Sequence, residues 1–192
     1  MMKTWGSIVV ATLVGVTAHA TFAQTAAFQC PPPGAFVRFS DDRVVTSVAP
    51  GANYCTMRFK SNSGEQDLKW YAPTLASPVN QQQFADQVKP WNLWPLSVGK
   101  KLSANYTGVG SGYGQGRWTQ NVSVDAYEKV TTKAGTYDAF VINRVEDAIS
   151  HQYKRTQRVW YAPAVGFIVK GTDTDTQGVN RAYEAVEVRP GR

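Results

Sequence analysis

The chain has 192 residues, carries 20 lysines and arginines against 14 acidic residues, and contains two cysteines. Its length suits one domain with a single core, and its formal charge of +6 is spread along the chain, which argues against nucleic-acid binding. After the first residues, no apolar run reaches the ~18 to 20 residues of a membrane-spanning helix.

The first residues have the pattern of an export signal. Lys3 supplies the positive start, an apolar stretch follows, and small residues precede a cleavage point after Ala20 or Ala23. We therefore expect a signal peptide over residues 1–23 and one mature domain over residues 24–192. The mature protein is expected in the periplasm or secreted.

The two cysteines, Cys30 and Cys55, are predicted to form a disulfide, because thiol pairs are oxidised outside the cytoplasm. Closing this loop of about 25 residues stabilises a fold by ~3.5 kcal/mol in the chain-entropy model. The bond would tie the proline-rich segment 31–33 to the first well-defined strand. Two cysteines and one histidine in the mature chain are too few ligands for structural zinc.

Apolar and polar residues alternate with a period of two through most of the mature chain. Cys55, Met57 and Phe59, for example, alternate with polar neighbours. The pattern is typical of half-buried antiparallel strands and predicts an all-β antiparallel sandwich or barrel of about nine or ten strands. The expected strands cover residues 35–39, 43–48, 55–60, 68–71, 101–107, 121–130, 137–146, 152–161, 165–170 and 180–189.

One segment breaks this pattern and predicts a short helix over about residues 81–89. Asn80 is a suitable N-cap, Gln83 stands where a capping box has its second residue, and Pro90 stops the run. The helix would cover an open end of a sheet. It connects, at about residues 80–90, two related β units that cover about residues 35–75 and 97–190.

A phrase in the first unit is repeated in the second. Residues 45–54 contain Val-Thr, a glycine turn and a tyrosine, and lead to Trp-Tyr-Ala-Pro at 70–73. Residues 130–137 have the same features and lead to Trp-Tyr-Ala-Pro at 160–163. Because the upstream residues are repeated too, each copy is interpreted as a structural element whose proline ends a strand. A ligand site is expected between the two copies.

The same phrases and a nearby basic cluster supply candidate ligand-binding residues. Aromatic faces beside lysine or arginine suit sugar rings or apolar ligands through stacking and cation-π contacts. The structural alternative is that the aromatics pack in a core and the basic side chains cover apolar neighbours. The candidates are Trp70, Tyr71, Lys154, Arg158, Trp160 and Tyr161.

Residues 173–184 partly match a calcium-binding loop, with Asp173, Asp175 and Glu184 at ligand positions. Arg181 would put a positive charge beside the ion, and the flanks are predicted strands where the motif needs helices. These three acids are kept as a calcium candidate, and no metal site is predicted.

Few residues suit catalysis. The glycines of segment 108–116 lack the Lys-Ser/Thr or the helix of a nucleotide loop, and His151 has no nucleophile motif near it. The adjacent acids at 41–42 and 146–147 point to opposite faces of a strand. The sequence therefore favours a protein without enzymatic activity or cofactor.

Three motifs in the second half of the mature chain carry a family resemblance. They are Trp-Pro-Leu-Ser-Val-Gly-Lys at 94–100, the segment from Val130 to Ile142, and the segment from Val159 to Lys170. As an ordered set they resemble a TapB-like domain-of-unknown-function family of bacterial envelope proteins. The resemblance implies an exported β-rich domain and supplies no catalytic residues.

These features predict an exported, non-enzymatic binding or accessory protein of the bacterial cell envelope. Two alternatives stay open: a hydrolase of an envelope polymer that uses carboxylates or His151, and a structural module of a larger assembly. Two carboxylates facing each other across an aromatic cleft would favour the hydrolase. The expected partner is an envelope glycan, lipid or protein.

Overall fold

The computed structural model describes residues 24–78, 81–109, 115–150 and 152–191, so the predicted signal peptide lies outside the described residues. The two short strands β1 (Thr25–Ala26) and β7 (Leu96–Ser97) pair with each other. The other strands are β2 (Phe36–Phe39), β3 (Val44–Pro50), β4 (Cys55–Ser61), β5 (Gly64–Ala72), β6 (Leu75–Pro78), β8 (Lys101–Val109), β9 (Gln115–Thr132), β10 (Gly135–Ala148), β11 (Lys154–Ala162), β12 (Phe167–Asp175) and β13 (Asn180–Arg189).

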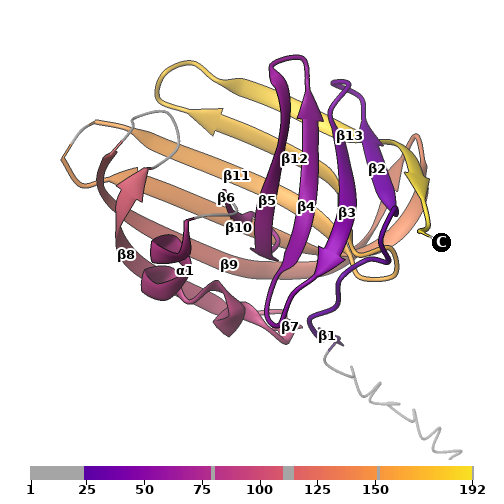
Figure 1. Ribbon diagram of the computed structural model, residues 1–192, viewed down its shortest axis with the longest axis horizontal. Coiled ribbons are helices and arrows are strands. Elements are labelled where there is room, and N and C mark those ends of the chain that lie inside the picture. Colours follow the sequence, from indigo (N-terminus) through magenta and orange to yellow (C-terminus); the bar gives the residue numbers. More distant parts are fainter. Residues whose placement is uncertain (1–23, 79–80, 110–114, 151, 192) are drawn as a thin grey trace, which may run out of the picture.

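These eleven strands form one antiparallel sheet in the order β6-β5-β4-β3-β2-β13-β12-β11-β10-β9-β8. The sheet curls into a half-barrel (Figure 1). Register shifts between Val141 and Ile142 and between Trp160 and Tyr161 interrupt the ladders, and such bulges bend a strand. The all-β prediction is confirmed. Of the predicted sandwich or barrel, the chain adopts the open half of a barrel, whose edges are β6 and β8.

The predicted helix is present as α1 (Gln82–Val88), followed by the 3-10 helix η1 (Pro90–Leu93). Its N-cap is Gln81, which makes no side-chain capping bond, and Asn80 lies outside the described residues. Helix α1 packs beside the edge strand β8. There the Gln87 amide accepts a hydrogen bond from the Thr107 N–H at 2.8 Å and donates to the Thr107 carbonyl at 3.1 Å. No helix in the described part of the chain has the length and apolar character needed to cross a membrane.

The repeated phrase occupies equivalent places in two four-strand meanders, β3 to β6 and β9 to β12. In each meander Trp-Tyr-Ala ends the third strand, and the proline lies in the turn to the fourth. Both turns contain a residue in the left-handed region, Thr74 at φ 70° and Gly166 at φ 74°. A Cβ atom on Gly166 would lie 2.8 Å from Pro31 Cγ, so glycine also permits the close packing of the N-terminal segment.

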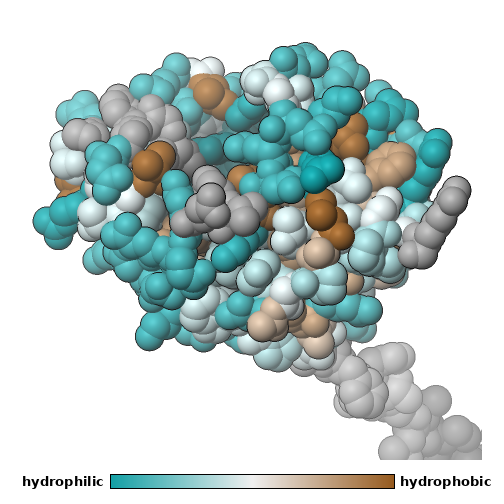
Figure 2. Space-filling view, viewed as in Figure 1, coloured by the Kyte–Doolittle hydropathy of each residue, from teal (hydrophilic) through white to brown (hydrophobic). Residues whose placement is uncertain are grey.

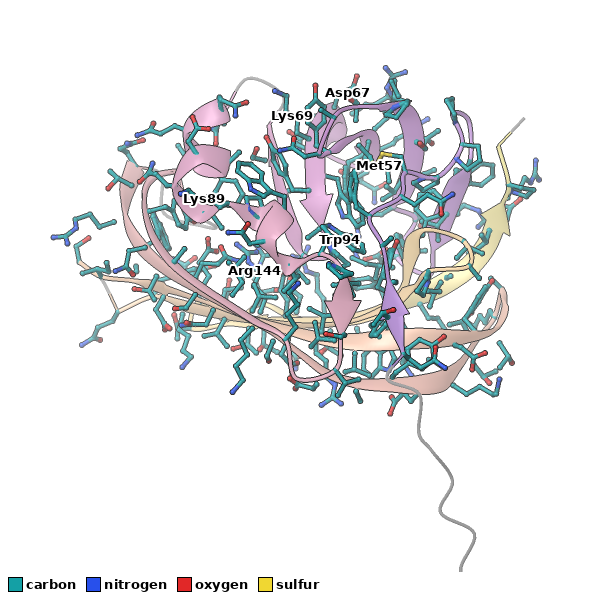
Figure 3. All side chains as sticks on the ribbon, turned by 90° about the horizontal axis from the view of Figure 1, so that it is seen from below. Met57, Asp67, Lys69, Lys89, Trp94 and Arg144 are labelled. Carbon is teal, nitrogen blue, oxygen red and sulfur yellow. A yellow bond between two sulfur atoms is a disulfide. The ribbon has the colours of Figure 1, made fainter. Side chains whose placement is uncertain are left out.

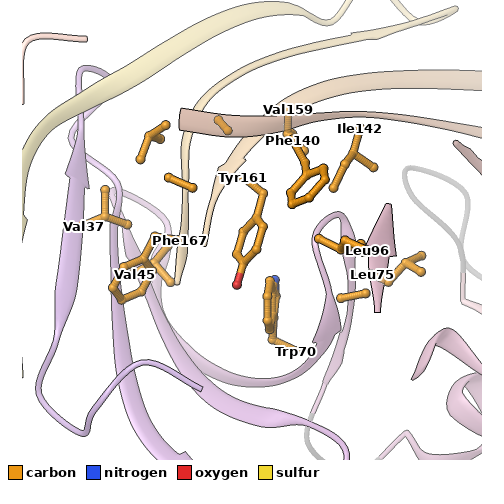
Figure 4. Close-up of a cluster of buried hydrophobic side chains, with 14 of the residues drawn as sticks. Val37, Val45, Trp70, Leu75, Leu96, Phe140, Ile142, Val159, Tyr161 and Phe167 are labelled. Atoms are coloured by element: carbon orange, nitrogen blue, oxygen red, sulfur yellow. The ribbon is translucent and has the colours of Figure 1, made fainter. Parts of the chain in front are cut away.

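Aromatic rings fill one end of the half-barrel. The rings of Trp70 and Tyr161 face each other with their centroids 5.8 Å apart (Figure 4). The centroids of Trp94 and Tyr161 are also 5.8 Å apart. The predicted disulfide between Cys30 and Cys55 is confirmed, with a Cα–Cα distance of 5.5 Å. Because Cys55 pairs with Trp70 across β4 and β5, the bond anchors the N-terminal segment beside this aromatic core.

Candidate functional site

The concave side of the half-barrel holds a cavity of about 400 Å³. Strands β4 to β6 form one wall and β10 to β12 the opposite wall, while Phe84 of α1 and Tyr106 of β8 contribute to the lining. The face of the molecule in Figure 2 is mostly hydrophilic, with scattered hydrophobic side chains. The volume lies within the ~300–1,000 Å³ of small-molecule sites, so this cavity is the candidate site.

In one wall of the cavity, neighbouring strands carry polar side chains at adjacent, paired positions. Residues two apart in a strand share a face, and the antiparallel registers align these faces from β9 to β12. We call the resulting group the polar wall; it consists of Gln120, Arg144, Glu146, Arg155, Gln157 and Asp173.

Glu146 is the buried centre of the polar wall, with an exposed fraction of 1%. Arg144 Nη2 lies 2.9 Å from its Oε1, and the Tyr106 hydroxyl donates to the same oxygen. Arg144 also donates to Gln157 Oε1 at 2.8 Å and to Gln120 Oε1 at 3.2 Å, and it lies in the space inside the curled sheet (Figure 3). Burial, and then the charge of Glu146, raise the pKa of Tyr106, so its hydroxyl remains a donor.

Asp173 holds two arginines at the other end of the polar wall. It is 3% exposed and accepts hydrogen bonds from Arg155 Nε at 2.7 Å and Arg181 Nη2 at 2.9 Å. Burial alone would raise the pKa of Asp173, but the hydrogen bonds and charges of Arg155 and then Arg181 outweigh it, and the pKa is lowered. Two guanidinium groups share one carboxylate, so this group carries one excess positive charge.

The rest of the cavity lining mixes apolar residues, such as Leu68, Trp70 and Ile168, with polar ones. The polar ones are Arg43, Gln66, Thr74, Ser77 and Gln81. A smaller recess of about 60 Å³ adjoins the cavity at Trp70 and is apolar except for Arg43. Its own lining consists of Val37, Phe39, Val45, Met57, Gly166 and Phe167, together with residues shared with the main cavity. The candidate site therefore has a charged end and a mainly apolar end.

Three of the predicted ligand-binding residues are buried, and only one of them lines the cavity. Trp70 of the first phrase points inward and contacts Tyr161 of the second. Tyr71 lies behind β5 against Trp91 and Tyr54, with ring centroids 6.3 and 5.8 Å away. The two phrases thus present opposite members, tryptophan in one and tyrosine in the other, to the interior.

The other three predicted residues lie on the convex side. Arg158 Cζ lies 5.3 Å from the centroid of the Trp160 ring, and Trp160 Nε1 donates to Glu128 at 2.8 Å. Lys154 Nζ is exposed and 3.9 Å from Asp147. The expected cation-π contact therefore forms on the outer surface, away from the cavity.

The three acids of the calcium candidate interact with other side chains of the protein. Asp173 is bound by arginines, Asp175 accepts the Tyr153 hydroxyl at 3.2 Å, and Glu184 lies 3.9 Å from Lys133 Nζ. Over the described ranges, no group of three acidic, histidine or cysteine side chains is arranged to hold a metal ion. His151 and residues 110–114 of the glycine-rich segment lie outside the described residues.

Arg144 was not predicted as a site residue, and Arg155 was recognised only as a member of the basic cluster around Lys154 and Arg158. Glu146 was considered only as one of two adjacent acids. A signal for them exists in the alternation. On β10 the inward phase begins with Phe140 and Ile142 and continues with Arg144 and Glu146. Charged residues that continue the apolar phase of a strand indicate a buried polar site.

Part of the chain is similar to a known protein family. Residues 117–185 match the model of the DUF3108-like family. This segment contains the whole polar wall, and the match confirms the resemblance of the second half of the chain to a domain of unknown function. A search of curated proteins finds no match.

Two solved structures are similar to the chain at 13% sequence identity. One is a "putative lipoprotein" from Parabacteroides distasonis, with a TM-score of 0.43 and coverage of 86% of this chain and 100% of that chain. The other is a "putative exported protein with YmcC-like fold" from Bacteroides fragilis, with a TM-score of 0.41 and coverage of 85% and 100%.

Proposed function

We propose that the protein is an exported, non-enzymatic binding protein of the bacterial cell envelope, in which residues 24–192 act as one domain. The observation that carries this proposal is the concave cavity of about 400 Å³, with the polar wall on one side and apolar residues on the other. Apolar lining supplies affinity for a small molecule, and a few fixed polar groups orient it. Export rests on the predicted signal peptide.

The carboxylates near the cavity support binding over hydrolysis. Glu146 is paired with Arg144, and Asp173 with Arg155 and Arg181. Both acids belong to the same wall, with β11 between their strands, so they do not face each other across the cavity. A glycosidase needs two carboxyl groups on opposite sides of the scissile bond.

The test is binding of N-phenyl-1-naphthylamine, an uncharged probe whose fluorescence rises in apolar surroundings, to the mature protein. Ala76 lines the cavity, and Ala76→Trp would place an indole ring inside it. Ala182 is exposed, and its neighbours Arg181 and Tyr183 point to the concave side, so Ala182→Trp is the matched control on the convex side.

We expect saturable binding by the wild type and the control, and at least a tenfold weaker affinity for Ala76→Trp. Mass spectrometry of the natively exported protein would identify a retained ligand. The proposal is wrong if the wild type does not bind the probe, or if Ala76→Trp binds it as well as the control does.

A further inference from the structure

The two ends of the cavity differ in polarity. Its polar end is formed by Arg144, Glu146 and Arg155, and its other end passes Trp70 into the recess. The recess is apolar except for Arg43, which is paired with Asp41 and lies over the Tyr183 ring at 4.2 Å. A ligand that matches both ends has a polar head and an apolar chain, because burying either group against the wrong surface costs free energy.

The charged groups that line the cavity favour an anionic head. Three arginines, Arg43, Arg144 and Arg155, line it together with one carboxylate, that of Glu146. The acids that neutralise Arg43 and Arg155, which are Asp41 and Asp173, are not part of the lining. A ligand in the cavity therefore meets mainly guanidinium groups.

Two of these guanidinium groups lie at the polar end and can be reached by a ligand. The side chains of Arg144 and Arg155 are 11% and 21% exposed. Arginine carries only donors, so a head that bonds these groups must be an acceptor. Carboxylate and phosphate oxygens match the guanidinium best in geometry and in charge.

Asp175, another acid near the polar wall, does not oppose the binding of an anionic head. Asp175 lies outside the cavity lining, and its oxygens accept the backbone N–H groups of Gln177 and Val179, both at 2.9 Å, and the Tyr153 hydroxyl. These donors hold the Asp175 carboxylate in the turn between β12 and β13.

We propose that the cavity binds an anionic amphiphile, a molecule with one apolar chain and a carboxylate or phosphate head. The head lies against Arg144, and the chain runs past Trp70 toward the recess. This assignment rests on the proposed function and deepens it by naming the ligand class.

The experiment displaces N-phenyl-1-naphthylamine with four competitors that share a dodecyl chain: dodecanoate, dodecyl phosphate, dodecanol and dodecylammonium. We expect the two anions to displace the probe at about tenfold lower concentration than the alcohol, as a hydrogen bond to a charged group predicts. Dodecylammonium should be the weakest. Tighter binding of dodecanoate would indicate a fatty acid as the ligand, and tighter binding of dodecyl phosphate would indicate a phosphate head.

A charge-balanced variant tests the position of the head. Arg144→Gln combined with Glu146→Gln removes both charges of the buried pair, so neither is left unpaired. Arg38→Gln combined with Glu187→Gln removes an exposed Arg–Glu pair and is the matched control. The first variant should bind the probe but lose the preference for anions, and the control should keep it.

The outcomes separate the two proposals. Probe binding by the wild type with equal displacement by dodecanol and dodecanoate overturns the ligand class and leaves the proposed function standing. No probe binding by the wild type overturns both. An anion preference that survives in the Arg144→Gln/Glu146→Gln variant overturns the head-group position. The wild-type comparison decides the ligand class even where that variant does not fold.

Discussion

Replacement of Asp173 by asparagine tests whether the polar wall is held together by charge. Asp173→Asn removes the buried carboxylate and leaves the Arg155 guanidinium, whose side chain is 21% exposed, without its counter-ion. Breaking a buried ion pair costs about 3–5 kcal/mol, and we expect about 3 kcal/mol here because Arg155 retains contact with water and asparagine still accepts one hydrogen bond. Native domains have only ~5–15 kcal/mol of stability, so the loss is readily measured.

The assay is urea unfolding followed by tryptophan fluorescence. The control is Arg181→Gln, because Arg181 is 52% exposed and an exposed partner contributes ~1 kcal/mol or less. The pH dependence supplies a second readout. The pKa of Asp173 is lowered in the folded state from its ordinary value of 3.8, so its contribution is fully present above that pH and is lost as the pH falls toward the folded-state pKa.

Asparagine does not titrate, so the difference in stability between wild type and Asp173→Asn should be full at neutral pH and shrink below pH 3.8. The reasoning is refuted if Asp173→Asn unfolds within ~1 kcal/mol of the wild type at neutral pH, as the exposed control is expected to do. A difference that stays constant as the medium is acidified would refute the electrostatic explanation.

Three further substitutions have expected effects on stability. Replacing both Cys30 and Cys55 by serine should lower the free energy of unfolding by ~3.5 kcal/mol, and an unchanged urea midpoint would show that the bond does not restrain the unfolded chain. Tyr106→Phe removes the hydroxyl that donates to the buried glutamate of β10 and should cost ~1–3 kcal/mol, whereas a neutral effect in urea unfolding would show that this hydrogen bond adds nothing. Gly171→Ala places a Cβ atom 2.5 Å from the ring of Tyr183, so it should lower the melting temperature through ~1–3 kcal/mol of overpacking; an unchanged melting curve would mean that the ring moves freely.

Most of the fold could be predicted from the alternation of apolar and polar residues. Strand β13 (Asn180–Arg189) coincides with the predicted range, and most other predicted strands lie within the observed ones. The short strands β1, β6 and β7 were missed, because two to four residues are too few to show a period. Strands β1 and β7 also pair with each other from distant parts of the chain, which local sequence does not encode, whereas β6 forms a hairpin with β5.

The candidate site was less predictable for a physical reason. The alternation groups Trp70 with Leu68 on β5 and Tyr161 with Arg155 on β11, but it does not tell which face of the sheet becomes concave. The alternation on β10 indicates a buried polar site, but the complete polar wall requires the alignment of four strands, which no single segment shows.

The paired hydrogen bonds of Gln87 affect how the molecule meets other chains. An open half-barrel has two edge strands with backbone groups available to a foreign strand, and such edges promote aggregation. On β8 the Gln87 amide acts as a stand-in for one residue of a neighbouring strand, because it bonds both the N–H and the carbonyl of Thr107. Helix α1 thereby caps part of the exposed ladder, so the sheet stays open without offering that stretch as a template for polymerisation.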